Sequence, residues 1–346
     1  MRQQVTIVGL GLIGGSIGLG LKRWSNQGGK RDDVLEITGF DIDLQNQNYA
    51  KKIKAVDRTE WNLHKAVDGA DLVILAVPPR AIREVMEAIG SSLTAGTVIC
   101  DVASTKADIM RWAEELLPDS VHFVGTHPMA GGSRSIEAAD GSLFEGATWC
   151  VVPSVSADEA AVQTVLGMVS ALGAEPMFVD AHEHDGFVGA VSHLPFVLST
   201  ALMRSVSKDP AWRDMQLLSA TGFRDVSRLA GGSPEMHRDI CVTNREAVAR
   251  WIDEAIEELQ HMRSLVTAGT EEADETLLKV FEEARDARAE WATRERGGRL
   301  VQNTENELTE FSVGGQLSQL MFGSFFRRKP RIEQGSGNQR SNGNRR

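Results

Sequence analysis

The sequence predicts an α/β protein in which an N-terminal doubly wound sheet is followed by an all-α domain. Three observations predict this fold class: short apolar runs alternate with helical stretches up to about residue 153, a glycine-rich turn closes the first run, and the pattern from about residue 156 is mainly helical. A length of 346 residues is enough for two domains of ordinary size. We therefore expect a sheet domain over 1–153, a helical domain over 154–296 and a C-terminal extension over 297–346.

The sheet domain is predicted from apolar runs that are nearly continuous, as is typical of parallel strands covered by helices on both faces. The runs are VTIVG (5–9), EITGFD (36–41), DLVILAVP (71–78), TVICDVAS (97–104), VHFVGTHP (121–128) and, as one more strand, WCVVP (149–153). The N-terminal segment is interpreted as the first strand and not as a signal peptide, because glycines break its apolar part.

Two long amphipathic helices are predicted in the second domain. One runs from Asp180 to about Ser207, with apolar residues at Phe187, Val191, Leu194, Leu198 and Leu202. The other covers 244–266, with an apolar stripe of Val248, Trp251, Ile252, Ala255, Ile256, Leu259, Met262 and Val266. Such stripes need a partner surface, so we expect a homodimer formed by helix packing, with an intrachain bundle as the alternative. Beyond Arg327 the sequence is polar and basic, and we expect it to be disordered.

Composition excludes several classes of function. A formal net charge of −11 argues against general nucleic-acid binding, which needs a basic face. The sequence contains no run of about 18 apolar residues, so no membrane span is expected. Cys100, Cys150 and Cys241 stand far apart without a CxxC pair, which predicts neither a disulfide framework nor a zinc ribbon and favours a reducing cytoplasm. His182 and His184 form HEH rather than HExxH, so no metal site is expected.

A glycine loop closes the first strand and opens the first helix, in a Rossmann-type arrangement. Gly9 permits the tight turn, Gly11 lets the backbone approach a pyrophosphate, and Gly14 lets helix and strand pack closely. Leu12 and Ile13 lie in the first helical turn, whose N–H groups would face the phosphates. The loop therefore predicts a dinucleotide cofactor.

The end of the second strand indicates which dinucleotide is bound. Asp41 would hydrogen-bond the ribose hydroxyls and repel a 2′-phosphate, which favours NAD over NADP. Asp43 is the alternative ribose partner, and Lys30 and Arg31 in the polar insert 25–33 are candidate contacts for a phosphate, which leaves NADP as the alternative cofactor.

Three further strands end at the edge where an open parallel sheet binds its ligand, and the residues that follow them are candidate site residues. Val77 and Pro78 follow one strand and are expected beside the cofactor, Ser104 follows the next, and His127 follows the third. Ser104 either caps the helix that starts near Lys106 or orients a substrate or a histidine. A neutral imidazole at His127, beside a nicotinamide, is suited to deprotonate a substrate hydroxyl as hydride leaves the same carbon.

The helical domain supplies further candidates. His193 lies in a helix that Pro195 is expected to kink, which indicates a site. His184 is expected to be a buried, hydrogen-bonded residue or a helix-start group. Residues 222–240 contain Arg224, Arg228 and Arg238, with Asp225 and Asp239 as partners; we expect at least one structural pair, while an unpaired arginine would clamp a carboxylate.

Together the segments GLGLIGGS, DVASTK, GTHPMAGG, AVSHLP and GFRDVSR…MHRDI, in this order and spacing, resemble the prephenate/arogenate dehydrogenase family of tyrosine biosynthesis over about residues 1–290. The resemblance implies a Rossmann domain joined to a helical dimerisation domain, with the site between them. It implies that His127 deprotonates the ring hydroxyl while hydride passes to the nicotinamide, and that Ser104 assists. It also implies that Arg228 clamps the ring carboxylate and that His193 contacts the side chain of the substrate, a dicarboxylate.

The chain departs from the family pattern at two places near the implied substrate side chain. The chain has Gly132-Ser133-Arg134-Ser135-Ile136 where many members have Glu-Lys-Ser-Gly or a similar run, and His237 stands where bacterial members often have an aromatic residue. Ser133, His237 and Arg224 are therefore candidate substrate contacts, and both prephenate and arogenate remain open as substrates. Two alternatives make different demands on the sequence. A β-hydroxyacid dehydrogenase would need a lysine base where AVSHLP offers a histidine, and an NAD-binding regulator would not require His127, Ser104 and Arg228 together.

Overall fold

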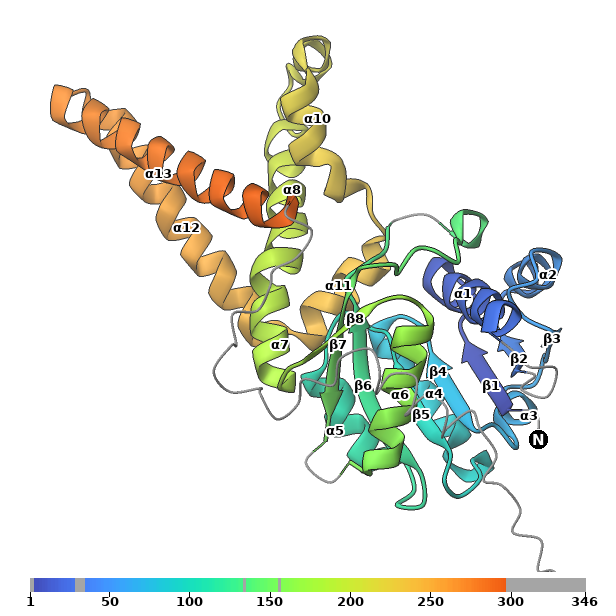
Figure 1. Ribbon diagram of the computed structural model, residues 1–346. Coiled ribbons are helices and arrows are strands. Elements are labelled where there is room, and N and C mark those ends of the chain that lie inside the picture. Colours follow the sequence, from blue (N-terminus) through green and yellow to red (C-terminus); the bar gives the residue numbers. More distant parts are fainter. Residues whose placement is uncertain (1–2, 29–34, 133–134, 155–156, 297–346) are drawn as a thin grey trace, which may run out of the picture.

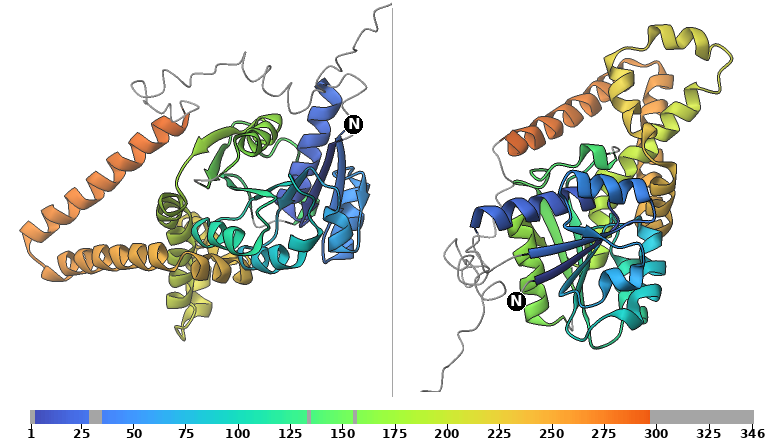
Figure 2. Two further views of the ribbon diagram at one scale, coloured as in Figure 1. Left: turned by 90° about the horizontal axis from the view of Figure 1, so that it is seen from below. Right: turned by 90° about the vertical axis from the view of Figure 1, so that its right-hand side faces the viewer.

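The computed structural model describes residues 3–28, 35–132, 135–154 and 157–296. It shows a twisted sheet flanked by helices, from which a helical part extends as two arms (Figure 1; Figure 2). Lys30, Arg31, Ser133 and the polar tail beyond Arg327 lie outside the described residues.

The sheet has eight strands in the order β3-β2-β1-β4-β5-β6-β7-β8. The first six pair in parallel, β7 runs antiparallel to β6, and β8 is parallel to β7. Their bounds are β1 Gln3–Val8, β2 Leu35–Phe40, β3 Arg58–Thr59, β4 Leu72–Leu75, β5 Val98–Asp101, β6 His122–Pro128, β7 Thr148–Pro153 and β8 Glu175–Phe178. Each apolar run that predicts a strand overlaps one, although β1, β2 and β7 begin one or two residues earlier than their runs. The expectation of an N-terminal doubly wound sheet is confirmed.

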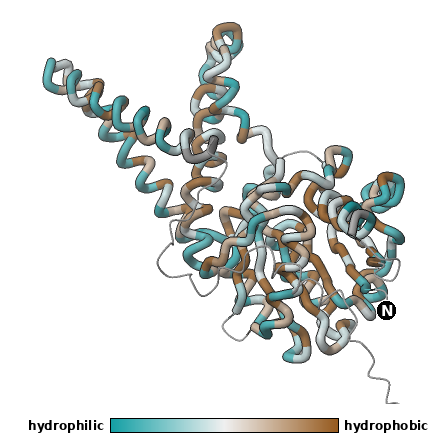
Figure 3. The backbone as a smooth tube through the Cα atoms, in the orientation of Figure 1, coloured by the Kyte–Doolittle hydropathy of each residue, from teal (hydrophilic) through white to brown (hydrophobic). Residues whose placement is uncertain are grey.

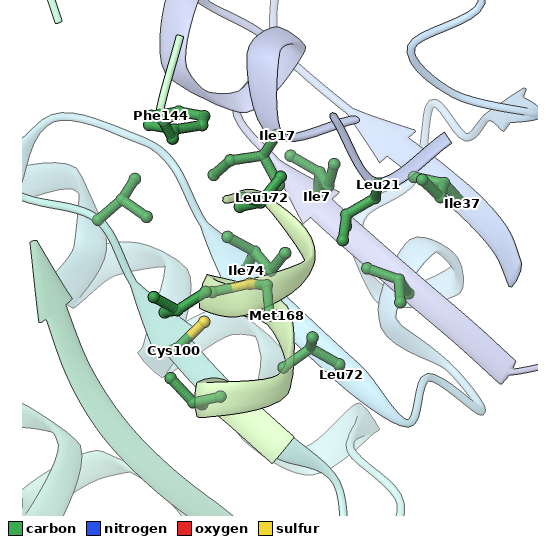
Figure 4. Packing of buried hydrophobic residues seen from close by; sticks show 14 of the residues in the cluster. Ile7, Ile17, Leu21, Ile37, Leu72, Ile74, Cys100, Phe144, Met168 and Leu172 are labelled. Carbon is green, nitrogen blue, oxygen red and sulfur yellow. The ribbon is translucent and has the colours of Figure 1, made fainter. Parts of the chain in front are cut away.

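Helices cover both faces of this sheet and bury two cores. On one face α1 (Leu12–Gly28) and α6 (Glu159–Ala171) pack against strand residues such as Ile7, Ile74 and Cys100 (Figure 4). On the other face α4 (Pro79–Ile89) and α5 (Ala107–Leu116) bury a second cluster. The shorter helices are α2 (Leu44–Lys52) and α3 (Leu63–Val67). Burial on both faces explains why the strand sequences lack polar alternation.

The sheet domain runs on to Phe178, past the boundary at residue 153 that the sequence predicts. The predicted boundary at residue 153 rests on the helical periodicity after residue 156. Periodicity shows that a helix has an apolar face but not which surface that face covers. In the structure, Val165 and Met168 of α6 are buried in the sheet's own core. The edge strand β8 escaped prediction because it is short, contains Pro176 and alternates half-buried with exposed residues.

The predicted helix from Asp180 to about Ser207 is confirmed as one continuous stretch. It comprises α7 (Ala181–Val188), the π-helical segment η3 (Gly189–His193) and α8 (Leu194–Val206). The N–H of Leu194 donates to the carbonyl of Gly189, a wider turn than in an α-helix, just before Pro195. The expected irregularity at the proline is therefore a π-helical turn that contains His193.

The remaining helices are α9 (Trp212–Met215), α10 (Thr221–Ser227), α11 (Pro234–Thr243), α12 (Arg245–Ala268) and α13 (Glu271–Arg296), with the short turn η5 (Arg228–Gly231) after α10. Helix α10 and η5 pack on α8, and α12 forms a long hairpin with α13 (Figure 1). Helix α11 lies against α4 of the sheet domain. The all-α second domain is confirmed.

Much of the apolar stripe along these helices is exposed. Val248 at the base of α12 is buried, whereas Val191, Leu259 and Val266 keep more than half of their surface exposed. Hydrophobic segments alternate with hydrophilic ones along α8 and α12, in contrast to the strands (Figure 3). An intrachain bundle therefore does not cover the stripe within the described residues. By length and composition alone, the stretch Ala181–Val206 is apolar enough to cross a membrane. The count of contiguous apolar residues does not predict this, because the stretch contains no unbroken run of about 18 apolar residues. In the structure the stretch contacts α10, α12 and η5.

Candidate active site

A cavity of about 730 Å³ opens at the carboxyl ends of the strands. It lies where the chain order reverses between β1 and β4, the position at which doubly wound sheets bind their ligands. Its lining comes from the glycine loop, from the ends of β2, β4, β5 and β6, and from one residue of the helical domain, Met236 of α11. The contact between α11 and α4 brings Met236 to the cavity.

The three glycines of the loop occupy different environments. A Cβ on Gly9, whose φ is +97°, would lie 2.3 Å from the carbonyl oxygen of Ala76, and a Cβ on Gly14 would lie 2.0 Å from that of Gly9. Those two glycines therefore permit the turn and the close packing of α1. A Cβ on Gly11 would meet no atom within 4 Å, because Gly11 faces the cavity. Gly9, Leu12 and Ile13 line the cavity as well, whereas Gly14 is packed behind the loop.

Asp41 lines the same cavity at the end of β2. Its carboxylate accepts hydrogen bonds from the backbone N–H of Leu10, at 2.7 Å, and of Asp43, at 2.8 Å. Asp43 instead caps α2 by accepting from the N–H of Gln45. Of the two acidic residues considered, Asp41 is thus the one held at the cavity wall, with its carboxylate fixed beside the glycine loop.

Val77, Pro78 and Ser104 also line the cavity. Ser104 does not cap α5: the helix begins at Ala107 without a side-chain cap from its own segment. The N–H groups of Lys106 and Ala107 instead donate to the two carboxylate oxygens of Asp185, at 2.7 and 2.9 Å. The capping alternative for Ser104 is therefore wrong, because a carboxylate from α7 occupies that helix end.

His127 ends β6 at the cavity and is 8% exposed. Its Nδ1 lies 2.9 Å from Nε2 of His184, and Nδ1 of His184 lies 2.8 Å from Oδ1 of Asp185. Burial holds the pKa of His127 well below its usual value, and positive charge on His184, when that ring is protonated, on Lys106 and on His193 lowers it further. The imidazole is therefore neutral at neutral pH and able to accept a proton.

A buried ion pair lies near His127, between the end of β5 and the start of α5. Lys106 and Asp101 are both fully buried, and Nζ of Lys106 contacts Oδ2 of Asp101. The carboxylate also accepts from the N–H of Ala103, at 2.9 Å, and of Thr126, at 3.1 Å. Asp101 thus joins the ends of β5 and β6, the strands that lead to Ser104 and His127.

His193 is fully buried in the π-helical segment. The side-chain amide of Asn244 donates to its Nδ1 at 3.1 Å, and its Nε2 has no hydrogen-bond partner among the described residues. Burial lowers the pKa of His193 to about 4. Asn244 also donates to the carbonyl of Asp185, so His193 and the chain from Asp185 to His127 share one polar cluster. His193 is not among the residues that line the cavity.

The arginines of residues 222–240 do not line the cavity of a single chain. Arg224 in α10 and Arg228 at the start of η5 are exposed and absent from its lining. His237 is stacked on Phe196, with ring centroids 4.2 Å apart. Arg238 forms an ion pair with Asp239, which confirms the expected structural pair.

Sequence reasoning missed Asp185, Asn244 and Met236 as parts of the site. The expectation that His184 is a buried, hydrogen-bonded residue is confirmed, but its partner, His127, lies 57 residues away in the chain. The signal available was the run His-Glu-His-Asp at the start of a predicted helix, where Asp185 follows His184 directly. Its meaning depends on the packing of α7 against α5, which periodicity does not reveal.

Comparison with known proteins agrees with this architecture. The family model for the prephenate dehydrogenase nucleotide-binding domain matches residues 27–177, and that for the prephenate dehydrogenase dimerization domain matches 180–283. The two matches divide where the sheet ends, just after β8.

Two curated relatives are prephenate dehydrogenases. The protein from Bacillus subtilis is 32% identical over 86% of this chain and 78% of its own length, and that from Lactococcus lactis is 34% identical over 83% and 77%. A crystal structure of prephenate dehydrogenase from A. aeolicus in complex with hydroxyphenyl propionate and NAD+ superposes with a TM-score of 0.75, at 28% identity, over 83% of this chain and 98% of that one. The crystal structure of Synechocystis arogenate dehydrogenase superposes with a TM-score of 0.68, at 25% identity, over 84% of this chain and 100% of that one. With its matching domains and relatives, the chain belongs to the prephenate dehydrogenase family.

Proposed function

We propose that this protein catalyses the NAD-dependent oxidative decarboxylation of prephenate to 4-hydroxyphenylpyruvate. The observation that carries the proposal is the position of His127, a neutral imidazole at the wall of the cavity that also holds the glycine loop and Asp41. The relatives from Bacillus subtilis and Lactococcus lactis, both above 30% identity, are prephenate dehydrogenases, and the A. aeolicus enzyme binds NAD+ together with a hydroxyphenyl compound.

The cavity fits a dinucleotide by its own geometry. Gly11 leaves room for a pyrophosphate at the N-terminus of α1, and the Asp41 carboxylate is fixed where the hydroxyls of a ribose would lie. A carboxylate at this position disfavours the 2′-phosphate of NADP. When bound, NAD accepts the hydride that leaves the ring carbon of the substrate.

The chemistry assigned to the protein is a proton transfer. His127 accepts the proton of the ring hydroxyl at Nε2, because Nδ1 is engaged by His184. As the hydroxyl proton and the hydride leave, a carbonyl forms; the ring carboxylate is then lost as carbon dioxide, and its bonding electrons complete the aromatic ring. Ser104, on the same wall, is proposed to orient the hydroxyl. The gain of aromaticity makes the overall step effectively irreversible.

We assign the carboxylates of prephenate to the helical side of the site. Arg228 is proposed as the clamp for the ring carboxylate, with Arg224 as the alternative, because neither arginine has an ion-pair partner among the described residues. The turn η5 that begins with Arg228 packs on α8, the helix that follows His193. His193 is proposed to contact the pyruvyl side chain through Nε2, and His237 is proposed to lie near the same end. Ser133, outside the described residues, stays a candidate substrate contact.

We also infer a homodimer in the cytoplasm. The exposed apolar residues of α8 and α12 fall within the segment that matches the dimerization domain, which supports packing between two copies. Cys100, Cys150 and Cys241 are all unpaired, as expected in a reducing compartment.

One spectrophotometric grid tests the proposal: prephenate and arogenate, each with NAD and with NADP, followed by the appearance of reduced nicotinamide. We expect the highest kcat/KM with prephenate and NAD. A preference for arogenate would change the substrate, and no reduction with either substrate would reject the proposed function.

A further inference from the structure

Two backbone N–H groups and three side chains from the two domains form one hydrogen-bonded chain that ends at the proposed base. Asp185 of α7 accepts from the N–H groups of Lys106 and Ala107 in the sheet domain, at 2.7 and 2.9 Å. The same carboxylate lies 2.8 Å from Nδ1 of His184, whose Nε2 lies 2.9 Å from Nδ1 of His127. The side chains of Asp185, His184 and His127 are all buried, so water does not compete for these contacts.

The protonation of this chain follows from its one acceptor-only member. A carboxylate only accepts hydrogen bonds, so Nδ1 of His184 carries a proton. If His184 is neutral, its Nε2 is an acceptor and must receive the proton on Nδ1 of His127. Nε2 of His127 is then the bare nitrogen. If His184 is instead a cation, Nδ1 of His127 must accept, and a neutral His127 carries its proton on Nε2, where it is unable to act as a base.

We propose that Asp185 and His184 are positioning residues that hold His127 in the tautomer with Nε2 bare and that stabilise its cation after it accepts the substrate proton. The inference rests on the proposed function, in which His127 is the base. Neither residue touches the cavity: His184 and Asp185 are absent from its lining, so they act through His127.

The charged groups around His127 agree with this arrangement. From β5 and the start of α5 come Asp101 and Lys106, which are paired with each other, so the ammonium is partly neutralised. From α7 come His184 and Asp185, and from the π-helical segment comes His193. Among the described residues, no lysine or arginine is paired with Asp185, and its hydrogen bonds come from backbone N–H groups and from His184.

The anchoring of Asp185 also ties the base to the domain interface. Its two oxygens occupy the N-terminus of α5, where backbone N–H groups and the helix dipole stabilise a negative charge. Thr105 and Thr243 form a further buried contact across the same interface at 2.9 Å, and Asn244 binds the carbonyl of Asp185 at 2.8 Å. The docking of the two domains thus fixes the orientation of His127.

Two isosteric substitutions at His184 separate positioning from mere packing. In His184→Gln the amide group replaces Nε2, so an acceptor for His127 is retained while the bond to Asp185 is lost. In His184→Asn the amide replaces Nδ1, so the bond to Asp185 is retained while the acceptor for His127 is lost. We expect His184→Asn to lower kcat by about 10–10³-fold, because a catalytic histidine in the wrong tautomer cannot accept the substrate proton. KM for prephenate and for NAD should change little. We expect His184→Gln to stay within about tenfold of the wild type.

The pH profile of kcat gives a second readout that packing alone would not move. Removing an acceptor that stabilises the His127 cation lowers the pKa of His127, so the acid limb of the profile moves to lower pH in His184→Asn. If His184 were a cation, its removal would move that limb to higher pH. Equal kcat for the two variants, or an upward shift of the acid limb, would overturn the inference. Unchanged circular dichroism and NAD affinity show that each variant is folded.

A spectroscopic test is independent of turnover. The ¹⁵N spectrum of histidine-labelled, substrate-free protein distinguishes a bare ring nitrogen from a protonated one, and His127→Asn and His184→Asn assign the signals. We expect His127 to carry its proton on Nδ1. If that tautomer is found but prephenate is not oxidised, the proposed function fails while the positioning of His127 stands. If prephenate is oxidised but His127 carries its proton on Nε2, the positioning inference fails alone.

Discussion

The backbone N–H of Lys106, in the sheet domain, donates a 2.7 Å hydrogen bond to Oδ1 of Asp185, in the helical domain. Because Asp185 also binds the next N–H along the chain, it caps a helix to which it is not connected in sequence. This capping across the interface places the partner of His127 and makes the site depend on both domains.

We predict that Asp185→Asn lowers the free energy of unfolding by about 1–3 kcal/mol, because an amide nitrogen would face a buried N–H that then has no acceptor. Urea unfolding measures the change. Asp180→Asn is the matched control: Asp180 caps α7 at an exposed end, where asparagine caps as well as aspartate. Equal stability of the two variants would contradict the cross-domain cap.

Replacing His127 by asparagine is expected to lower kcat by about 10²–10⁴-fold while KM changes little, because a general base acts mainly in the transition state. Steady-state kinetics with prephenate and NAD measure this effect. Unchanged turnover would remove His127 from catalysis.

Two glycine substitutions separate the folding role of the loop from its binding role. Gly9→Ala forces a left-handed φ on alanine and a clash with the carbonyl of Ala76, so it should destabilise the protein by at least about 1–2 kcal/mol. Gly11→Ala meets no protein atom and should leave the melting temperature unchanged, but its methyl group fills the space of the pyrophosphate and should raise KM for NAD. A Gly11→Ala variant with normal KM for NAD would place the cofactor elsewhere.

Arg228→Ala is expected to raise KM for prephenate by roughly 10–150-fold, since a charge-assisted hydrogen bond contributes roughly 1.5–3 kcal/mol. The effect on kcat should be smaller, because the clamp binds ground state and transition state alike. Arg224→Ala, one helical turn away, serves as the control. If KM rises in that variant and not in Arg228→Ala, the clamp is Arg224.

Acid should destabilise the protein through its buried histidines. His193 has a pKa of about 4 in the folded protein, against an ordinary value of 6.5, so the unfolded chain binds more protons between these limits. The pKa of His127 is shifted in the same direction. The free energy of unfolding should therefore fall as pH falls from 6.5 towards 4, by up to about 1.4 kcal/mol per pH unit for each histidine. Denaturant unfolding at pH 7 and pH 5 measures the slope, which should decrease in His193→Asn and persist in a variant of the exposed His64.

The sheet, its glycine loop and the placement of His127 were predictable from sequence because each depends on local patterns. A buried parallel strand needs a continuous apolar run, and the tight turn at Gly9 needs a residue that tolerates a φ of +97°. The ligand edge then follows from strand direction alone, and it correctly brings Ser104 and His127 to one cavity.

The contacts between domains were not predictable in this way. Nothing in the pattern around Asp185 shows that it caps α5, and the periodicity of α6 does not show that the helix covers the sheet. The exposed position of Arg228 in a single chain also depends on how α10 and η5 pack on α8. These features arise from tertiary packing, for which a single sequence carries no periodic signal.

The most direct test of the central claim is the stoichiometry of one reaction: the purified full chain with prephenate and NAD, in which reduced nicotinamide, carbon dioxide and 4-hydroxyphenylpyruvate are measured together. We predict that the three products form in equal amounts and that their formation is lost in parallel in His127→Asn. Formation of reduced nicotinamide without carbon dioxide, or no reaction at all, would contradict the proposal that this cavity oxidises and decarboxylates prephenate.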